Sequence, residues 1–199
     1  WLIGYSDVTA ILNHVYFKHS VASLHAIMPI NIKKEIFDSS AIESMLNLLF
    51  GKEFSFTTSC DFAQKDCKVK GKIIGGNLSV LYSLLGSESF GETDDLILLI
   101  EDLDEYLYHI DRMMQALKRA GKLKNLKALL VGAMTQMHDN TIPFGKTAYR
   151  IIEEAVKQYN YPKIFGASIG HIEERNNAVI IGGEIEIEVK ENTIITKQL

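Results

Sequence analysis

Ser6 is the first side chain of the sequence with a chemical role to consider. It stands in Gly4-Tyr5-Ser6-Asp7, between an apolar strand-like run and an amphipathic helix. Such a turn lifts a hydroxyl out of a sheet, and the free N–H groups at the start of the helix can hold an oxyanion. A serine before a helix is nevertheless far more often an N-cap. Val8 also stands where a G-x-S-x-G elbow needs glycine. The segment alone leaves both interpretations open.

An acidic side chain ends the apolar run Leu98-Leu99-Ile100-Glu101-Asp102. A carboxylate at the carboxyl end of a buried strand lies where α/β folds place their sites, and it can orient a histidine ring. The alternative is a solvated acidic loop. The local sequence does not rank Glu101 above Asp102, Asp104 or Glu105.

His171 is the third candidate, in Ile169-Gly170-His171-Ile172-Glu173. The glycine before it lets the backbone turn tightly and lets a substrate approach the ring. A surface-loop histidine is the local alternative. His25 lies in an apolar loop, where it could line a pocket, although a packed core histidine is the simpler interpretation.

Gly75-Gly76-Asn77 precedes an expected helix and could cradle an anion; the alternative is a tight turn with Asn77 as the helix cap. The Lys-Ser/Thr end of a Walker loop is missing. No histidine pair has zincin spacing and no carboxylate cluster has calcium-loop spacing, so neither a metal nor another cofactor is expected. Cys60 and Cys67 have no matching pair elsewhere and indicate free thiols in a reducing, cytoplasmic compartment.

Apolar periodicity and cap residues predict an α/β chain with a β-rich C-terminal end and a domain boundary near residue 55. The segment 24–29 is expected to be a loop. Helices are expected at 8–18, 39–50, 78–85, 106–120 and 147–159, and strands at 1–5, 67–74, 95–101 and 126–133 and near residues 164, 179, 185 and 194.

Composition narrows the classes of partner. The chain has 199 residues and a formal net charge of −4, with lysine and arginine spread along it, so a nucleic-acid partner is not expected. Its apolar runs are too short to span a bilayer, and no targeting segment is recognised. Because the sequence opens directly on the apolar run Trp1–Tyr5, we expect further residues to precede it in the gene product.

Four segments together resemble the LD-carboxypeptidase family of serine peptidases, which also contains the microcin C immunity peptidases. Their order and spacing agree with the family, so the resemblance covers nearly the whole chain. The segments are Ile3-Gly-Tyr-Ser-Asp-Val-Thr9, Gly71-Lys-Ile-Ile-Gly-Gly-Asn-Leu-Ser79, Leu99-Ile-Glu-Asp102 followed by Tyr108-His-Ile-Asp-Arg-Met113, and Gly170-His171.

The resemblance implies a flavodoxin-like N-terminal domain, of which residues 1–55 would be the C-terminal part, and a C-terminal α/β domain over residues 56–199. It implies a triad of Ser6, Glu101 and His171. Substrate and oxyanion contacts would come from the Asp7 N–H and from Gly75, Gly76 and Asn77.

The activity implied is hydrolysis of an amide between an L-centre and a C-terminal D-amino acid, as in trimming murein tetrapeptides during peptidoglycan recycling, by a homodimer. An aminoacyl-adenylate-like or other amidated small molecule is the alternative substrate, and a noncatalytic ligand-binding protein is the alternative of another class.

Three departures from the family pattern accompany the resemblance. The upstream glycine-rich segment that would supply the second oxyanion donor is absent, so the chain by itself is expected to lack half of its oxyanion hole and to be inactive. His25-Ala26 replaces a His-Gly pair, and Ile172-Glu-Glu-Arg-Asn176 replaces a shorter turn after His171.

Overall fold

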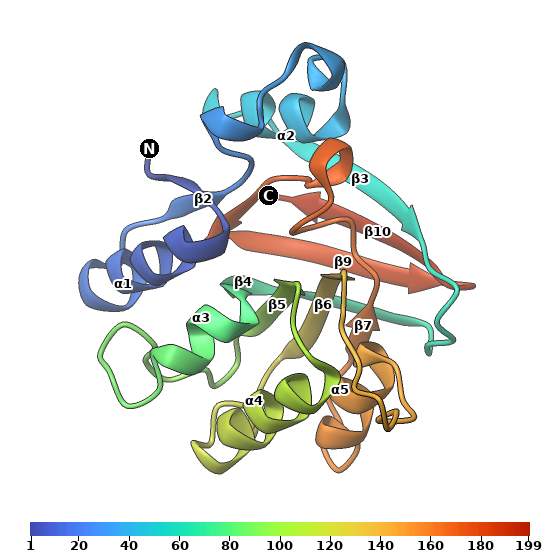
Figure 1. Cartoon of the computed structure of the whole chain (residues 1–199). Helices are drawn as coiled ribbons and strands as arrows, with labels where there is room; N and C mark the ends of the chain where they lie inside the picture. The colour runs from blue at the N-terminus through green and yellow to red at the C-terminus, as the bar shows by residue number, and fades with distance from the viewer.

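The computed structural model describes the backbone of residues 1–199 and every side chain except those of residues 35 and 173. Its main sheet contains β3 (Phe54–Ser59), β4 (Cys67–Asn77), β5 (Ile97–Leu103), β6 (Ala128–Thr135), β7 (Lys163–Phe165), β9 (Glu184–Lys190) and β10 (Thr193–Gln198). The strand order is β3-β10-β9-β4-β5-β6-β7 (Figure 1). Helices pack against this sheet, which confirms the predicted α/β class.

Strand β4 joins the two parts of the sheet. Its first residues pair antiparallel with β9, from Cys67 opposite Val189 to Lys72 opposite Glu184. Its last residues, from Ile73 to Asn77, pair parallel with β5. One strand therefore belongs both to the antiparallel part formed by the C-terminal strands and to the parallel part formed by β5, β6 and β7.

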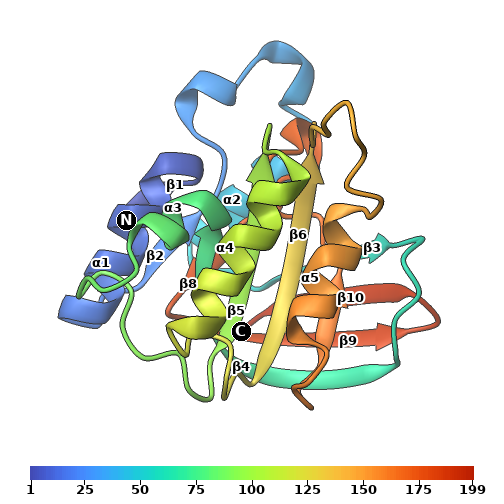
Figure 2. The same ribbon diagram turned by 60° about the horizontal axis from the view of Figure 1, so that its bottom comes forward.

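Three helices cover one face of the parallel part: α3 (Leu78–Ser83), α4 (Leu107–Arg119) and α5 (Ala148–Val156) (Figures 1 and 2). Strand side chains alternate between the two faces. Leu98 therefore joins Met113 of α4 in the core beneath the helices, while Leu99 lies in the core on the other face. The continuous apolar run of β5 is thus buried on both faces, as its sequence predicts. No helix within the described residues is long and apolar enough to cross a membrane.

A smaller sheet carries the N-terminus. It consists of β1 (Ile3–Gly4), β2 (Ser23–His25) and β8 (Val179–Ile181); β2 pairs parallel with β1 and antiparallel with β8. After β1 the chain forms a 3-10 turn (Ser6–Val8) and then α1 (Thr9–His19). Helix α2 (Ser40–Leu49) begins at the cap Ser39 and places Leu48 in the core beneath β2.

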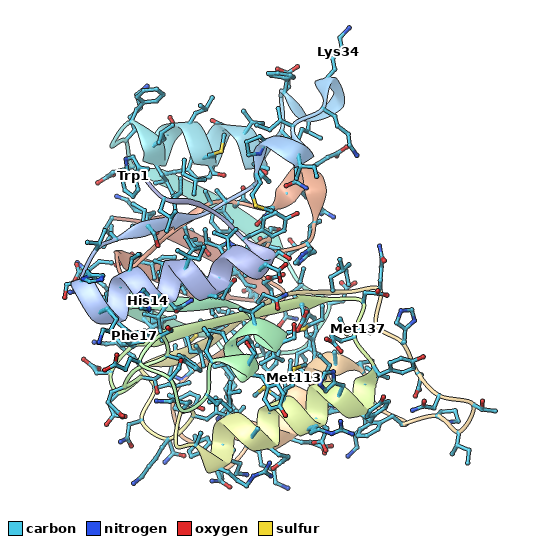
Figure 3. All side chains as sticks on the ribbon, turned by 60° about the vertical axis from the view of Figure 1, so that its left-hand side comes forward. Trp1, His14, Phe17, Lys34, Met113 and Met137 are labelled. Atoms are coloured by element: carbon cyan, nitrogen blue, oxygen red, sulfur yellow. The ribbon has the colours of Figure 1, made fainter. Side chains whose placement is uncertain are left out.

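Short 3-10 helices complete the chain at Pro29–Asn31, Lys34–Ile36 and Glu173–Arg175. Lys34 stands at the tip of the segment between β2 and α2 (Figure 3).

Two strands lie where the sequence does not predict them. Strand β2 falls in the expected loop, because three residues are too few to show an alternating pattern. Strand β3 carries serine and threonine at its exposed positions, so its sequence suggests a polar bridge, and its pairing with β10 decides its conformation. The predicted domain boundary near residue 55 stays a prediction.

Helix α1 docks on the end of β4 through a buried polar contact. The side-chain amide of Asn13 accepts a hydrogen bond from the Gly75 N–H and donates one to the Gly75 carbonyl, both at 3.0 Å. Gly75 has φ +106°, and a Cβ there would lie 2.1 Å from the Leu99 carbonyl oxygen. On the side of α1 that faces α3, His14 and Phe17 extend toward the segment after α3, where His14 Nδ1 lies 2.9 Å from Ser89 Oγ (Figure 3).

The glycine pair is therefore part of a strand, and the prediction of a turn at Gly75-Gly76 was wrong. Both residues pair with β5, opposite Leu99 and Ile100. Asn77 is the N-cap of α3, as the alternative interpretation expected, and accepts a hydrogen bond from the Val80 N–H at 3.1 Å.

The substitution Gly75→Ala tests this close packing. We expect it to lower the free energy of unfolding by about 3 kcal/mol or more, because it combines a positive φ with a backbone clash. Gly86→Ala is the matched control: Gly86 has φ +83°, but a Cβ there meets no atom within 4 Å. It should cost about 1 kcal/mol. Urea unfolding measures both, and equal losses would contradict the packing argument.

Candidate active site

Glu101 and His171 form a buried pair. Glu101 lies near the carboxyl end of β5 with 0% of its surface exposed. Its Oε2 atom lies 2.7 Å from His171 Nδ1 and accepts a second hydrogen bond from the His171 backbone N–H at 3.2 Å. The structure thus brings together two of the three residues singled out for a triad, from segments 70 positions apart.

Two glycines allow the histidine loop to reach the carboxylate. The pairing of β5 with β6 shifts register after Ile100, and Gly132 lies at this irregularity. A Cβ on Gly132 would approach the Ile169 carbonyl oxygen to 2.5 Å. Gly170 has φ +105°, and a Cβ on it would lie 2.4 Å from Glu101 Oε2. Larger residues at these two positions would push the histidine loop away from β5.

The carboxylate sets the proton affinity of His171. Burial lowers the pKa of the imidazole, but the hydrogen bond and the negative charge of Glu101 outweigh burial, with a smaller contribution from Asp102, and the pKa is raised. The ring is therefore a stronger base than an unperturbed histidine. With Nδ1 directed at Glu101, the Nε2 atom is left for a reacting group.

Asp102 faces the opposite side of β5 and has a different environment. Its carboxylate accepts hydrogen bonds from Asn77 Nδ2, from the Ser79 N–H and from the Leu103 N–H, each at 2.9 Å. Burial raises its pKa to about 6, against the opposing effect of these donors. Of the two adjacent acids, which the sequence alone does not rank, only Glu101 contacts the histidine.

Ser6 lies at a strained turn between β1 and α1. Its φ is +57°, an unfavourable region for a residue with a side chain, and its side chain is partly exposed. The preceding residue connects it to the pair: the Tyr5 ring packs against the His171 ring with centroids 4.7 Å apart. No hydrogen bond joins Ser6 to His171, both of which are described in full. The turn that carries Ser6 therefore contacts His171 through the ring of Tyr5.

The remaining predicted site residues lie around α1. Asp7 is exposed in its first turn. The Asn77 N–H donates to Thr9 Oγ1 at 3.1 Å, and a Cβ on Gly76 would lie 2.6 Å from the same atom. These contacts fix the start of α1 against β4. A role of Asp7, Gly75, Gly76 and Asn77 in holding an oxyanion or a substrate stays a prediction.

Two residues near the site have no counterpart among the sequence predictions. Tyr5 supplies the ring that lies against His171, and its hydroxyl accepts a hydrogen bond from Asn31 Nδ2 at 3.0 Å. Proximity to Ser6 in the sequence is the one signal that could have indicated Tyr5. Asn31 gives no such signal, because it lies in an irregular segment. The described side chains include no group of three or more His, Cys, Asp or Glu residues placed to hold a metal ion.

Comparison with known proteins assigns the chain to a family. Residues 70–187 match the model of the LD-carboxypeptidase C-terminal domain. Since this match covers more than half of the chain, the chain belongs to the LD-carboxypeptidase family, which confirms the resemblance seen in its sequence.

Individual relatives agree with this assignment. The chain is 29% identical to the probable murein peptide carboxypeptidase of Bacillus subtilis, over 96% of the chain and 61% of that protein. Muramoyltetrapeptide carboxypeptidase from Oxalobacter formigenes has the same fold, with a TM-score of 0.86 at 22% identity over 98% of the chain and 67% of the solved one. The self-immunity protein MccF, solved with glutamyl sulfamoyl guanosine, gives 0.82 at 21% identity over 97% and 66%. The chain thus spans about three fifths to two thirds of the length of these relatives.

The substitution Glu101→Gln tests the electrostatic origin of the raised pKa. We expect the pKa of His171 to fall, because burial is then opposed only by the smaller effect of Asp102. Titration of the imidazole by NMR measures this shift. Asp102→Asn is the matched control, since it changes a neighbouring acid that does not touch the ring, and it should cause a smaller fall. Falls of equal size would show that the direct hydrogen bond is unimportant.

Stability should depend on pH through the same pair. A histidine whose pKa is raised in the folded state contributes stability below the unfolded pKa of about 6.5, and this contribution disappears as the pH rises through the folded pKa. The wild-type protein should therefore lose more stability than Glu101→Gln between pH 5.5 and pH 8.5 in urea unfolding. Asp102 is present in both proteins, and the charge of Glu101 is the smallest of the effects on its pKa, so its titration largely cancels. Parallel pH curves for the two proteins would contradict the expectation.

Proposed function

We propose that the complete protein is a serine-type LD-carboxypeptidase, a hydrolase in which Ser6, Glu101 and His171 form the triad. The observation that carries the proposal is the buried Glu101–His171 pair with Tyr5, the neighbour of Ser6, packed on the imidazole. This arrangement supplies a base of raised pKa beside an exposed turn. Membership of the LD-carboxypeptidase family supports the same reaction class.

In the proposed mechanism His171 Nε2 removes the proton of Ser6 as the serine oxygen attacks the amide carbonyl. Glu101 holds Nδ1–H, and thereby the correct tautomer, and stabilises the imidazolium that forms. His171 then gives the proton to the leaving amine, and water, activated by the same ring, hydrolyses the acyl-enzyme. The N–H groups at the start of α1, beginning with that of Asp7, are the proposed oxyanion donors on this chain.

The proposed substrate is a murein tetrapeptide, from which the enzyme releases the C-terminal D-amino acid. The names of the Bacillus subtilis and Oxalobacter formigenes relatives support this choice. The likeness to MccF in complex with an aminoacyl sulfamoyl nucleoside supports a second candidate, in which the same triad cleaves an aminoacyl-nucleotide-like molecule. Free thiols at Cys60 and Cys67 fit the proposed cytoplasmic location. A homodimer is the proposed working form.

The proposal is tested on the full-length protein with a murein tetrapeptide and, in parallel, with glutamyl sulfamoyl adenosine. We expect release of D-alanine, and covalent labelling of Ser6 by a fluorophosphonate probe. Both should be lost in Ser6→Ala, and should fall by about 10³-fold or more in His171→Ala.

His109→Ala is the matched control. His109 Nδ1 also lies against a carboxylate, 2.5 Å from Glu105 Oε2, but this pair is partly exposed on α4. The control should keep the activity of the wild-type protein. Cleavage of the nucleoside analogue alone would establish the second candidate, and a wild-type protein that is neither labelled nor active on either substrate would refute the proposed catalysis.

A further inference from the structure

His25 is a buried histidine whose polar atoms have no partner. Its side chain is 0% exposed, and neither Nδ1 nor Nε2 has a hydrogen-bond partner among the described residues. A buried imidazole carries at least one N–H group, and leaving this donor without an acceptor is unfavourable. Its position is fixed: His25 lies on β2, opposite Gly4 of β1 on one side and Val179 of β8 on the other.

A second unpartnered atom lies in the same interior. Glu101 Oε2 has two donors, but Oε1 is buried and has none among the described groups. A buried carboxylate oxygen without a donor has lost the hydrogen bonds that water would supply, which is unfavourable. The ring N–H of His25 lacks an acceptor and Glu101 Oε1 lacks a donor, so each residue has the group that the other needs.

Three contacts place His25 beside the pair. The Tyr5 ring packs against His171 and meets the His25 ring edge-on, with centroids 6.1 Å apart. A Cβ on Gly76 would lie 3.3 Å from His25 Cδ2, and the next residue of β4, Asn77, is opposite Glu101 in the sheet. The side chain of His25 therefore lies between the segment that leads from β1 to Ser6 and the end of β5.

We propose that His25 is a positioning residue of the triad: one of its ring N–H groups donates a hydrogen bond to a water molecule, which in turn donates one to Glu101 Oε1. The inference rests on the proposed function of Glu101 and His171. The bond would fix the orientation of the carboxylate and share its charge, so that Glu101 neither rotates away from His171 nor binds its proton too tightly.

Electrostatics favour a neutral donor at this position. Burial lowers the pKa of His25; the charge of Glu101 opposes this effect, and that of His171 reinforces it. A neutral ring can donate a hydrogen bond without repelling the imidazolium that forms on His171 during the reaction. The titratable groups that face His25 and His171 are Glu101 and, more weakly, Asp102 from β5, together with Tyr5, which follows β1.

The test uses the full-length protein and follows the His171 imidazole by NMR. His25→Phe keeps a flat ring but removes both nitrogens, so the unshared charge of Glu101 should raise the pKa of His171 by about one pH unit. The acidic limb of kcat/KM should move by the same amount, which is about a tenfold loss at pH 6 with KM unchanged. His25→Gln retains an N–H donor and should restore most of both values.

A double-mutant cycle separates positioning from packing. In a Glu101→Gln background, His25→Phe should leave the pKa of His171 unchanged, because the carboxylate charge that the proposed bond shares is gone. An equal shift in both backgrounds, or a folded His25→Phe protein with the wild-type pKa, overturns the inference.

If His25→Phe does not fold, the test is hydrogen exchange of the His25 ring N–H with solvent in the wild-type protein. Slow exchange that becomes fast in Glu101→Gln supports the bond, and rapid exchange in the wild-type protein refutes it. None of these NMR results requires turnover, so an inactive wild-type protein would overturn the proposed function while leaving the hydrogen bond to be judged separately.

Discussion

The rest of the site depends on placing one carboxylate, that of Glu101, entirely inside the protein. Removing such a group from water is unfavourable unless hydrogen bonds compensate for it. In this structure the compensation comes from a single residue, since both the imidazole and the backbone N–H of His171 point at the same oxygen. The loop must therefore approach β5 more closely than side chains normally allow. Gly132 and Gly170 permit that approach, and their positions follow from the carboxylate.

The segment that carries Ser6, the proposed nucleophile, is held by other contacts. Ser6 lies in the turn between β1 and α1, and these elements are fixed by the small sheet and by the amide of Asn13 on Gly75. The acid and the base belong to β5 and to the loop after β7. The two halves of the proposed triad thus have separate supports and meet at the Tyr5 ring, which contacts His171. A change in the packing of α1 can therefore displace the serine without disturbing the Glu101–His171 pair.

The sequence predicted the helices and strands whose pattern of polar and apolar residues lies within one segment. The short apolar run before Glu101 favours a buried strand, and the polar and apolar positions of α4 define a helix over nearly its observed length. The family resemblance selected Glu101 and His171, which the local sequence could not do. Contacts between distant segments stayed hidden, because no pattern within a segment encodes them. The register shift at Gly132, the pairing of β2 with β8 and the unpartnered ring of His25 all belong to this group.

Strand β8 has a consequence for how the protein folds during its synthesis on the ribosome. It pairs with β2, which in turn holds β1, so a strand far along the sequence secures the one that leads to Ser6. His171 also emerges late, shortly before β8. A nascent chain that has exposed the serine and even Glu101 therefore still lacks both the base and the strand that fixes the elbow. Contacts between such distant segments form slowly, and the site can assemble only after β8 has been synthesised.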